Sequence, residues 1–79
     1  MERKAQLAEY IKNEVIRNRN ASLDESEDLI GAGILDSLGI LQLVAFIHDA
    51  FGIDVPDEDV IFENFYSLES IANYLKQYS

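Results

Sequence analysis

Apolar residues recur at helical spacing in three stretches of this 79-residue chain. In the first stretch, from residue 3 to about residue 18, they fall at the i, i+3 and i+4 positions that share one face of a helix. Its apolar positions are Leu7, Ala8, Ile11 and Val15. A last helix is predicted after Ser67, a residue type suited to cap a helix N-terminus. Its apolar positions are Leu68, Ile71, Leu75 and Tyr78.

The stretch from Ser37 to Phe51 predicts a longer helix that is apolar on two faces. One face carries the positions expected to enter the core: Ile40, Leu43, Val44, Ile47 and Phe51. The second face, here called the apolar strip, lies on nearly the opposite side and consists of Leu38, Leu41 and Ala45. A helix with two apolar faces is either fully buried or has a partner for one of them. In so small a domain we expect an interaction face, and the alternative is that the segment 21–35 folds over the strip.

The connecting segments contain residue types that end helices and form turns. Residues 21–35 show no sustained period, and Gly31 and Gly33 interrupt them. Gly52 is suited to end the long helix, and Pro56 to open a short helix at about residues 57–62. Only residues 53–55 have the composition of a strand. We therefore predict one all-α domain over residues 1–79, a small four-helix bundle with three longer helices and one short third helix.

The charge of the chain is strongly negative and unevenly distributed. The formal net charge is −9, and residues 20–75 contain twelve acids with no Lys or Arg. Such a surface repels phosphate backbones, so we expect no nucleic-acid partner. It should steer the protein toward basic patches on partner proteins, at rates that fall as salt rises. The alternative is that the acidity serves only solubility.

The composition limits the chemistry that the chain can perform alone. It contains no cysteine, which excludes disulfides, thiolate metal ligands and a thiol nucleophile of its own. No apolar run approaches the roughly 20 residues that span a bilayer, and the N-terminus lacks the apolar segment of a signal peptide. We expect a cytoplasmic protein with no membrane partner.

Residues 28–38 read DLIGAGILDSL, an acid and Leu, a Gly-containing turn, two apolar residues and then Asp-Ser-Leu opening a helix. This order resembles the signature of the acyl carrier protein family, whose members carry a phosphopantetheine arm. The likeness continues through the long helix, the turn at residues 51–56 and the start of the last helix at residues 67–71. Asp-Ser alone would be an ordinary N-cap pair, but the likeness covers nearly the whole chain.

The resemblance implies a free-standing, monomeric and non-enzymatic carrier of acyl or aminoacyl thioesters. Ser37 would bear 4'-phosphopantetheine derived from coenzyme A, and Asp36 would shape the helix start and be recognised by the phosphopantetheinyl transferase. Leu38, Leu41 and Ala45 would contact partner enzymes. These would include an acyl- or aminoacyl-activating ligase or an acyltransferase, and the downstream enzymes of the pathway. A phosphodiester on Ser37 would lie against free backbone N–H groups at the positive end of the helix dipole.

One departure from the family pattern concerns the pathway. Fatty-acid members usually place several acids along the second helix, whereas residues 37–51 here contain only Asp49. Gly39 and Gln42 stand where acids are common in the family. This difference favours more apolar contacts and a specialised pathway, such as polyketide or aminoacyl transfer, over a housekeeping role in fatty-acid synthesis.

Two other classes of protein compete with the carrier, an unmodified helical adaptor and a serine hydrolase. An unmodified helical adaptor would present the apolar strip to one lasting partner. A serine hydrolase would need Ser37 beside a base, but His48 lies eleven residues further along the same helix, roughly 16 Å away. The acids from Asp54 onward lack the Gly and final Glu of a calcium loop. We therefore predict no catalytic residue and no metal ligand in this chain.

Overall fold

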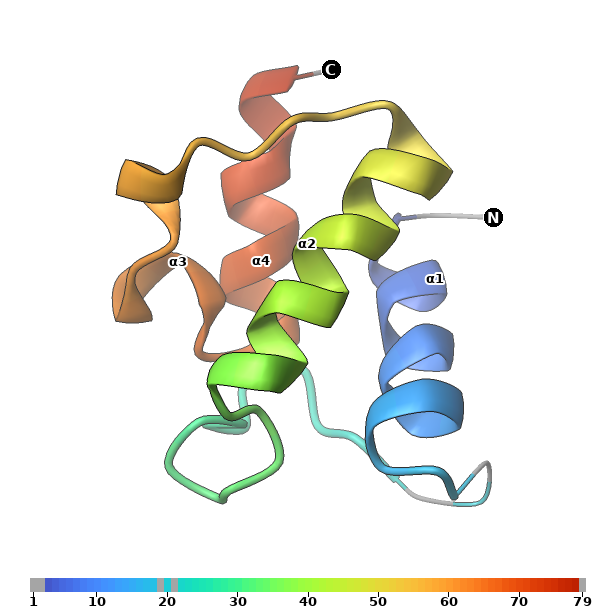
Figure 1. The fold of residues 1–79 in the computed structure, drawn as a ribbon. Coiled ribbons are helices and arrows are strands. Elements are labelled where there is room, and N and C mark those ends of the chain that lie inside the picture. The colour runs from blue at the N-terminus through green and yellow to red at the C-terminus, as the bar shows by residue number, and fades with distance from the viewer. Residues whose placement is uncertain (1–2, 19, 21, 79) are drawn as a thin grey trace.

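The computed structural model describes residues 3–18, 20 and 22–78, and this part of the chain contains helices and no strand (Figure 1). The α-helices are α1 (Arg3–Tyr10), α2 (Ser37–Phe51), α3 (Phe62–Phe65) and α4 (Leu68–Leu75). A π-helical turn, η1 (Ile11–Val15), continues α1, and two 3-10 turns are η2 (Asp57–Asp59) and η3 (Lys76–Tyr78). The predicted all-α fold, with three longer helices and a short third one, is confirmed.

The core lies between the apolar faces of the three longer helices. Fully buried side chains come from α1 and η1, from α2, α3 and α4, and from the loop before α2. They are Leu7, Ile11, Leu29, Leu35, Leu43, Ile47, Phe65, Leu68, Ile71 and Leu75. The first predicted helix is shorter than expected, because α1 widens into the π turn and Arg17 then takes a left-handed backbone conformation with φ 60°.

The short third helix is placed differently from the prediction. Residues 57–59 form only the 3-10 turn η2, and α3 begins at Phe62. The β-branched Val60 and Ile61 separate the two, with Ile61 in extended backbone at φ −126° and ψ 161°. The side-chain amide of Asn64 donates to the carbonyl of Asp59 (2.9 Å) and thereby fixes α3 to the end of η2.

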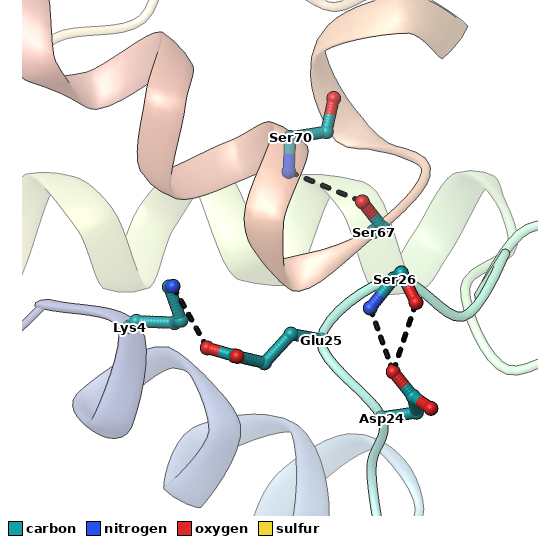
Figure 2. A network of polar contacts seen from close by, with 6 residues as sticks. All are labelled: Lys4, Asp24, Glu25, Ser26, Ser67 and Ser70. Atoms are coloured by element: carbon teal, nitrogen blue, oxygen red, sulfur yellow. Dashed lines mark hydrogen bonds and ion pairs between the residues drawn. The ribbon is translucent and has the colours of Figure 1, made fainter.

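The long segment between η1 and α2 is fixed to α1 and α4 through Glu25. Lys4 of α1 forms an ion pair with Glu25 (2.7 Å), and the backbone N–H of Glu69 in α4 donates to the carbonyl of Glu25 (3.0 Å). Figure 2 shows Glu25 reaching α1 beside the turn in which Asp24 accepts two hydrogen bonds from Ser26. It also shows the predicted cap of α4, in which the Ser67 hydroxyl accepts from the N–H of Ser70 (3.1 Å).

Candidate functional site

The N-terminus of α2 is capped by Asp36, whose carboxylate accepts a hydrogen bond from the backbone N–H of Gly39 (2.8 Å). The Asp36 carbonyl accepts from the N–H of Ile40 (2.9 Å), which closes the first helical turn. Ser37 is therefore the first helical residue, and it is exposed to solvent. The predicted bounds of α2, from Ser37 to Phe51, are confirmed.

The loop before Asp36 is held in place by one buried residue, Leu29. Its N–H donates to the carbonyl of Tyr66 (2.7 Å), at the junction of α3 and α4. Its carbonyl accepts from the N–H groups of Ile34 (2.9 Å) and Leu35 (3.0 Å). Leu35 itself is only 1% exposed. Because Leu35 is bonded to this anchor two residues before Ser37, the backbone that presents the serine is fixed to the fold.

Gly31 and Gly39 occur where an aspartate side chain lies close to the backbone. A Cβ at Gly31 would lie 2.4 Å from the Asp28 carboxylate, which accepts from the Gly31 N–H (2.8 Å) and forms the turn. A Cβ at Gly39 would lie 3.3 Å from the Asp36 carboxylate and 3.5 Å from Leu35. The glycine that replaces an expected acid in α2 therefore lets the first turn pack closely against its own cap.

The position of Ser37 fits a covalently attached phosphodiester. The hydroxyl is exposed, and the first turn of a helix leaves backbone N–H groups without helical partners at the positive end of the dipole. The Asp36 carboxylate already occupies one of these donors, the N–H of Gly39, so a phosphodiester would use the others.

The apolar strip lies exposed on α2. Leu38 is 63% exposed and Leu41 is 65% exposed, and Ala45 is also exposed. Leu43 and Ile47 on the other face are fully buried. The alternative in which the segment 21–35 folds over the strip is therefore wrong, because Leu29 and Leu35 turn into the core instead.

His48 lies near the other end of α2 and is paired with a different residue. Its Nδ1 atom is 2.5 Å from the Asp54 carboxylate, and both side chains are largely exposed. This pair follows the turn at Gly52, whose φ of 69° is the left-handed conformation expected of a helix-ending glycine. The structure does not bring His48 to Ser37, so the serine has no histidine base among the described residues.

The pattern of apolar positions missed one feature, an aromatic contact between α1 and α2. The rings of Tyr10 and Phe46 stack with centroids 4.3 Å apart and an interplanar angle of 22°. Phe46 also makes an edge contact with Phe51 (5.7 Å). Both Tyr10 and Phe46 are half-buried, between the core face and the exposed face of their helices. Aromatic residues at such boundary positions are the signal that would have identified the contact.

Two negative findings apply to the described part of the chain. No group of three or more His, Cys, Asp or Glu side chains there is arranged to hold a metal ion. None of its helices combines the length and apolar character needed to cross a bilayer.

The structure therefore places a capped serine at the start of a helix, on a small acidic helical domain. Residues 5–75 match the family described as "Phosphopantetheine attachment site", and the chain belongs to this family. Its members bear covalently attached 4'-phosphopantetheine and are not catalysts themselves.

Two relatives extend this comparison. The D-alanyl carrier protein of Streptococcus uberis is 34% identical over 53 residues, which is 67% of each chain. A chain in a solved structure titled "Crystal structure of FAD-dependent dehydrogenase" is similar with a TM-score of 0.79 and 29% identity. That alignment covers 86% of this chain and 96% of the other.

Proposed function

We propose that Ser37 is the attachment site and that the protein carries acyl or aminoacyl groups as thioesters on the arm. The observation that supports this most directly is an exposed serine at the first position of α2, with its cap supplied by Asp36. A phosphopantetheinyl transferase must reach the serine, and a rigid, solvent-facing helix terminus allows that approach. The arm supplies the thiol that this cysteine-free chain lacks.

The loading reaction balances without any group from the carrier other than the hydroxyl. The Ser37 oxygen forms a bond to the phosphorus that bears the pantetheine of coenzyme A, and the pyrophosphate bond to the nucleotide breaks. The nucleotide leaves as adenosine 3',5'-bisphosphate, and the hydroxyl proton passes to a base of the transferase. The new phosphodiester remains at the N-terminus of α2, where dipole and N–H groups favour a negative charge.

We propose an aminoacyl or other small acyl cargo in a specialised pathway. The likeness to a D-alanyl carrier protein favours an aminoacyl group, loaded by an adenylate-forming ligase that activates the free acid. The single acid along α2 also favours partner enzymes that contact apolar residues, with Leu38, Leu41 and Ala45 as the docking strip. We place this exchange between soluble enzymes of the cytoplasm.

A second fate for the cargo is favoured by the structural comparison. The alignment covers nearly all of a chain no longer than this one, in a structure titled as an FAD-dependent dehydrogenase. An enzyme of that class as a downstream partner would oxidise the cargo while it remains on the arm. Oxidised cargo that is still attached to the carrier after incubation with such an enzyme, with its FAD reduced, would distinguish this fate from simple transfer.

The test of the attachment site is an intact mass with peptide mapping. The protein is incubated with coenzyme A and a broad-specificity phosphopantetheinyl transferase, beside the variants Ser37→Ala and Ser22→Ala. We expect one phosphopantetheine on the wild type and on Ser22→Ala, because Ser22 is an exposed serine outside the motif. No addition to folded wild type would favour the unmodified adaptor, as would full pathway activity of Ser37→Ala. Turnover of activated esters by the unmodified protein would instead support a hydrolase.

A further inference from the structure

The stacked pair of Tyr10 and Phe46 forms a ridge on the surface between α1 and α2. The Tyr10 hydroxyl donates to the backbone carbonyl of Gln42 (3.2 Å), which ties the ring to α2. Two hollows lie beside the ridge, and both are lined by Tyr10, Phe46 and Glu14. The ridge is therefore held in one orientation and remains accessible from two sides.

The two hollows differ in charge. The first, of about 310 Å³, is lined by Gln6, Glu9, Tyr10, Asn13, Glu14 and Phe46. Its described lining holds two carboxylates, two amides and two aromatic rings, with no Lys or Arg. The second, of about 290 Å³, also contacts Arg17 and extends over α2 to Ala45. Glu14 borders both hollows, and among the described lining residues a cation, Arg17, borders only the second.

These groups match the properties of a guanidinium. A planar cation stacks on aromatic faces and donates in parallel to carboxylate oxygens, and an arginine does both better than a lysine does. Glu14 lies close enough to Tyr10 that its charge, after burial of the ring, contributes to raising the pKa of the tyrosine. The carboxylate and the ring therefore act on one small volume, so a single cationic group can meet both.

We propose that the first hollow is a docking site for an arginine side chain of a partner enzyme, with the guanidinium between the ridge and the carboxylates of Glu9 and Glu14. This inference names the partner chemistry for the carrier function proposed above, but the site needs neither the arm nor Ser37. The second hollow connects it to the exposed face of α2 through Ala45. An enzyme anchored there would cross the apolar strip toward Ser37.

Position and charge both favour an enzyme over a second copy of this chain. Phe46 lies nine residues after Ser37, about 14 Å along the helix axis, so an anchor at the ridge leaves the attachment site accessible. Two copies would each bring a net charge of −9, which opposes their association. Residues 1–19 hold five of the six Lys and Arg residues of the chain, so the attraction for an arginine at this hollow comes locally from Glu9 and Glu14 and not from the acids of residues 20–75.

The test uses N-acetyl-arginine amide as the probe, titrated into isotope-labelled protein and followed by NMR. We expect saturable shifts centred on residues 9–14 and Phe46, with N-acetyl-lysine amide binding at least about twofold more weakly. Glu14→Gln should weaken arginine binding by about two- to fivefold, the range for an exposed ion pair. Phe46→Leu, which preserves an apolar side chain, should weaken it similarly by removing the stacking surface.

The matched control is Glu63→Gln, which removes an exposed acid on α3 and should leave arginine binding unchanged. Circular dichroism verifies that each variant is folded. The proposal would be overturned by equal NMR shifts at the acids of residues 57–59, or by lysine binding as tightly as arginine. It would also be overturned by arginine binding that Glu14→Gln leaves unchanged, or by a dimer that buries Phe46. Ser37→Ala should bind the arginine probe like wild type. Failure of arginine binding and failure of phosphopantetheine attachment are therefore separate outcomes.

Discussion

Removal of the Asp36 cap tests how the helix start supports Ser37. In the structure the Asp36 carboxylate is the acceptor for the N–H of Gly39, a buried residue. Loss of an N-cap costs about 0.5–2 kcal/mol, and burial of the donor places Asp36→Ala near the upper end, at about 2 kcal/mol. For a domain of this size that lowers the Tm by about 8–16 °C, at 4–8 °C per kcal/mol.

The control variant Asp36→Asn separates the cap from its charge. Asparagine caps as well as aspartate, so this variant loses only the charge–dipole interaction, about 0.3–1 kcal/mol. Urea unfolding measures both costs, and the rate of loading by the transferase is compared at a temperature where all three proteins are folded. If the transferase recognises the carboxylate, Asp36→Asn should be loaded slowly although it is nearly as stable as wild type. Equal stability of Asp36→Ala and wild type would refute the structural role of the cap.

Four further predictions concern stability and docking. Burial, with hydrogen bonds to Asp59 (2.6 Å) and Tyr78 (3.2 Å), raises the pKa of Tyr74 above its ordinary 10.0. The neutral tyrosine therefore contributes stability that is fully present below pH 10 and is lost as the pH rises above 10. In alkaline unfolding, Tyr74→Phe should lose less stability between neutral and high pH than wild type does. Arg17→Gly should stabilise by about 0.5 kcal/mol in urea, because relief of the left-handed strain exceeds the entropy cost of glycine, and Arg17→Ala should not. Added salt should raise the Tm by screening the acids, and an unchanged Tm would show that the repulsion is already relieved. Leu41→Asp should weaken enzyme docking more than Gln42→Ala, and equal losses would exclude the apolar strip as the interface.

The site could be located from the sequence because local signals define it. Asp36 and Gly52 act within one turn of their own positions, so the two ends of α2 follow from residue type alone. The exposure of the apolar strip was also predictable, since the helical period assigns Leu43 and Leu41 to different faces. The proposed role of Ser37 came from the family resemblance, since a serine after an N-cap is common and does not by itself indicate attachment.

The remaining features depend on contacts between distant residues. The shift of α3 follows from Asp59, which accepts from Asn64 through its backbone and from Tyr74 of α4 through its side chain. The second contact joins residues fifteen positions apart, which no local pattern specifies. The ridge likewise requires α1 and α2 to pack so that Tyr10 meets Phe46, thirty-six positions later.

The buried face, the exposed face and the N-terminal end of α2 are separate surfaces, so each can have a different role. Its buried face, with Leu43 and Ile47, fixes the helix to the core, so an enzyme can bind the opposite face without loosening the fold. Ser37, the proposed attachment site, lies at the N-terminal end of the helix. With few acids on α2, selectivity must come from the shape of the apolar strip and from charges supplied by α1. The hollow beside Tyr10 adjoins the one that reaches Ala45 of the strip, so the proposed arginine site would let an enzyme recognise a helix that is poor in acids.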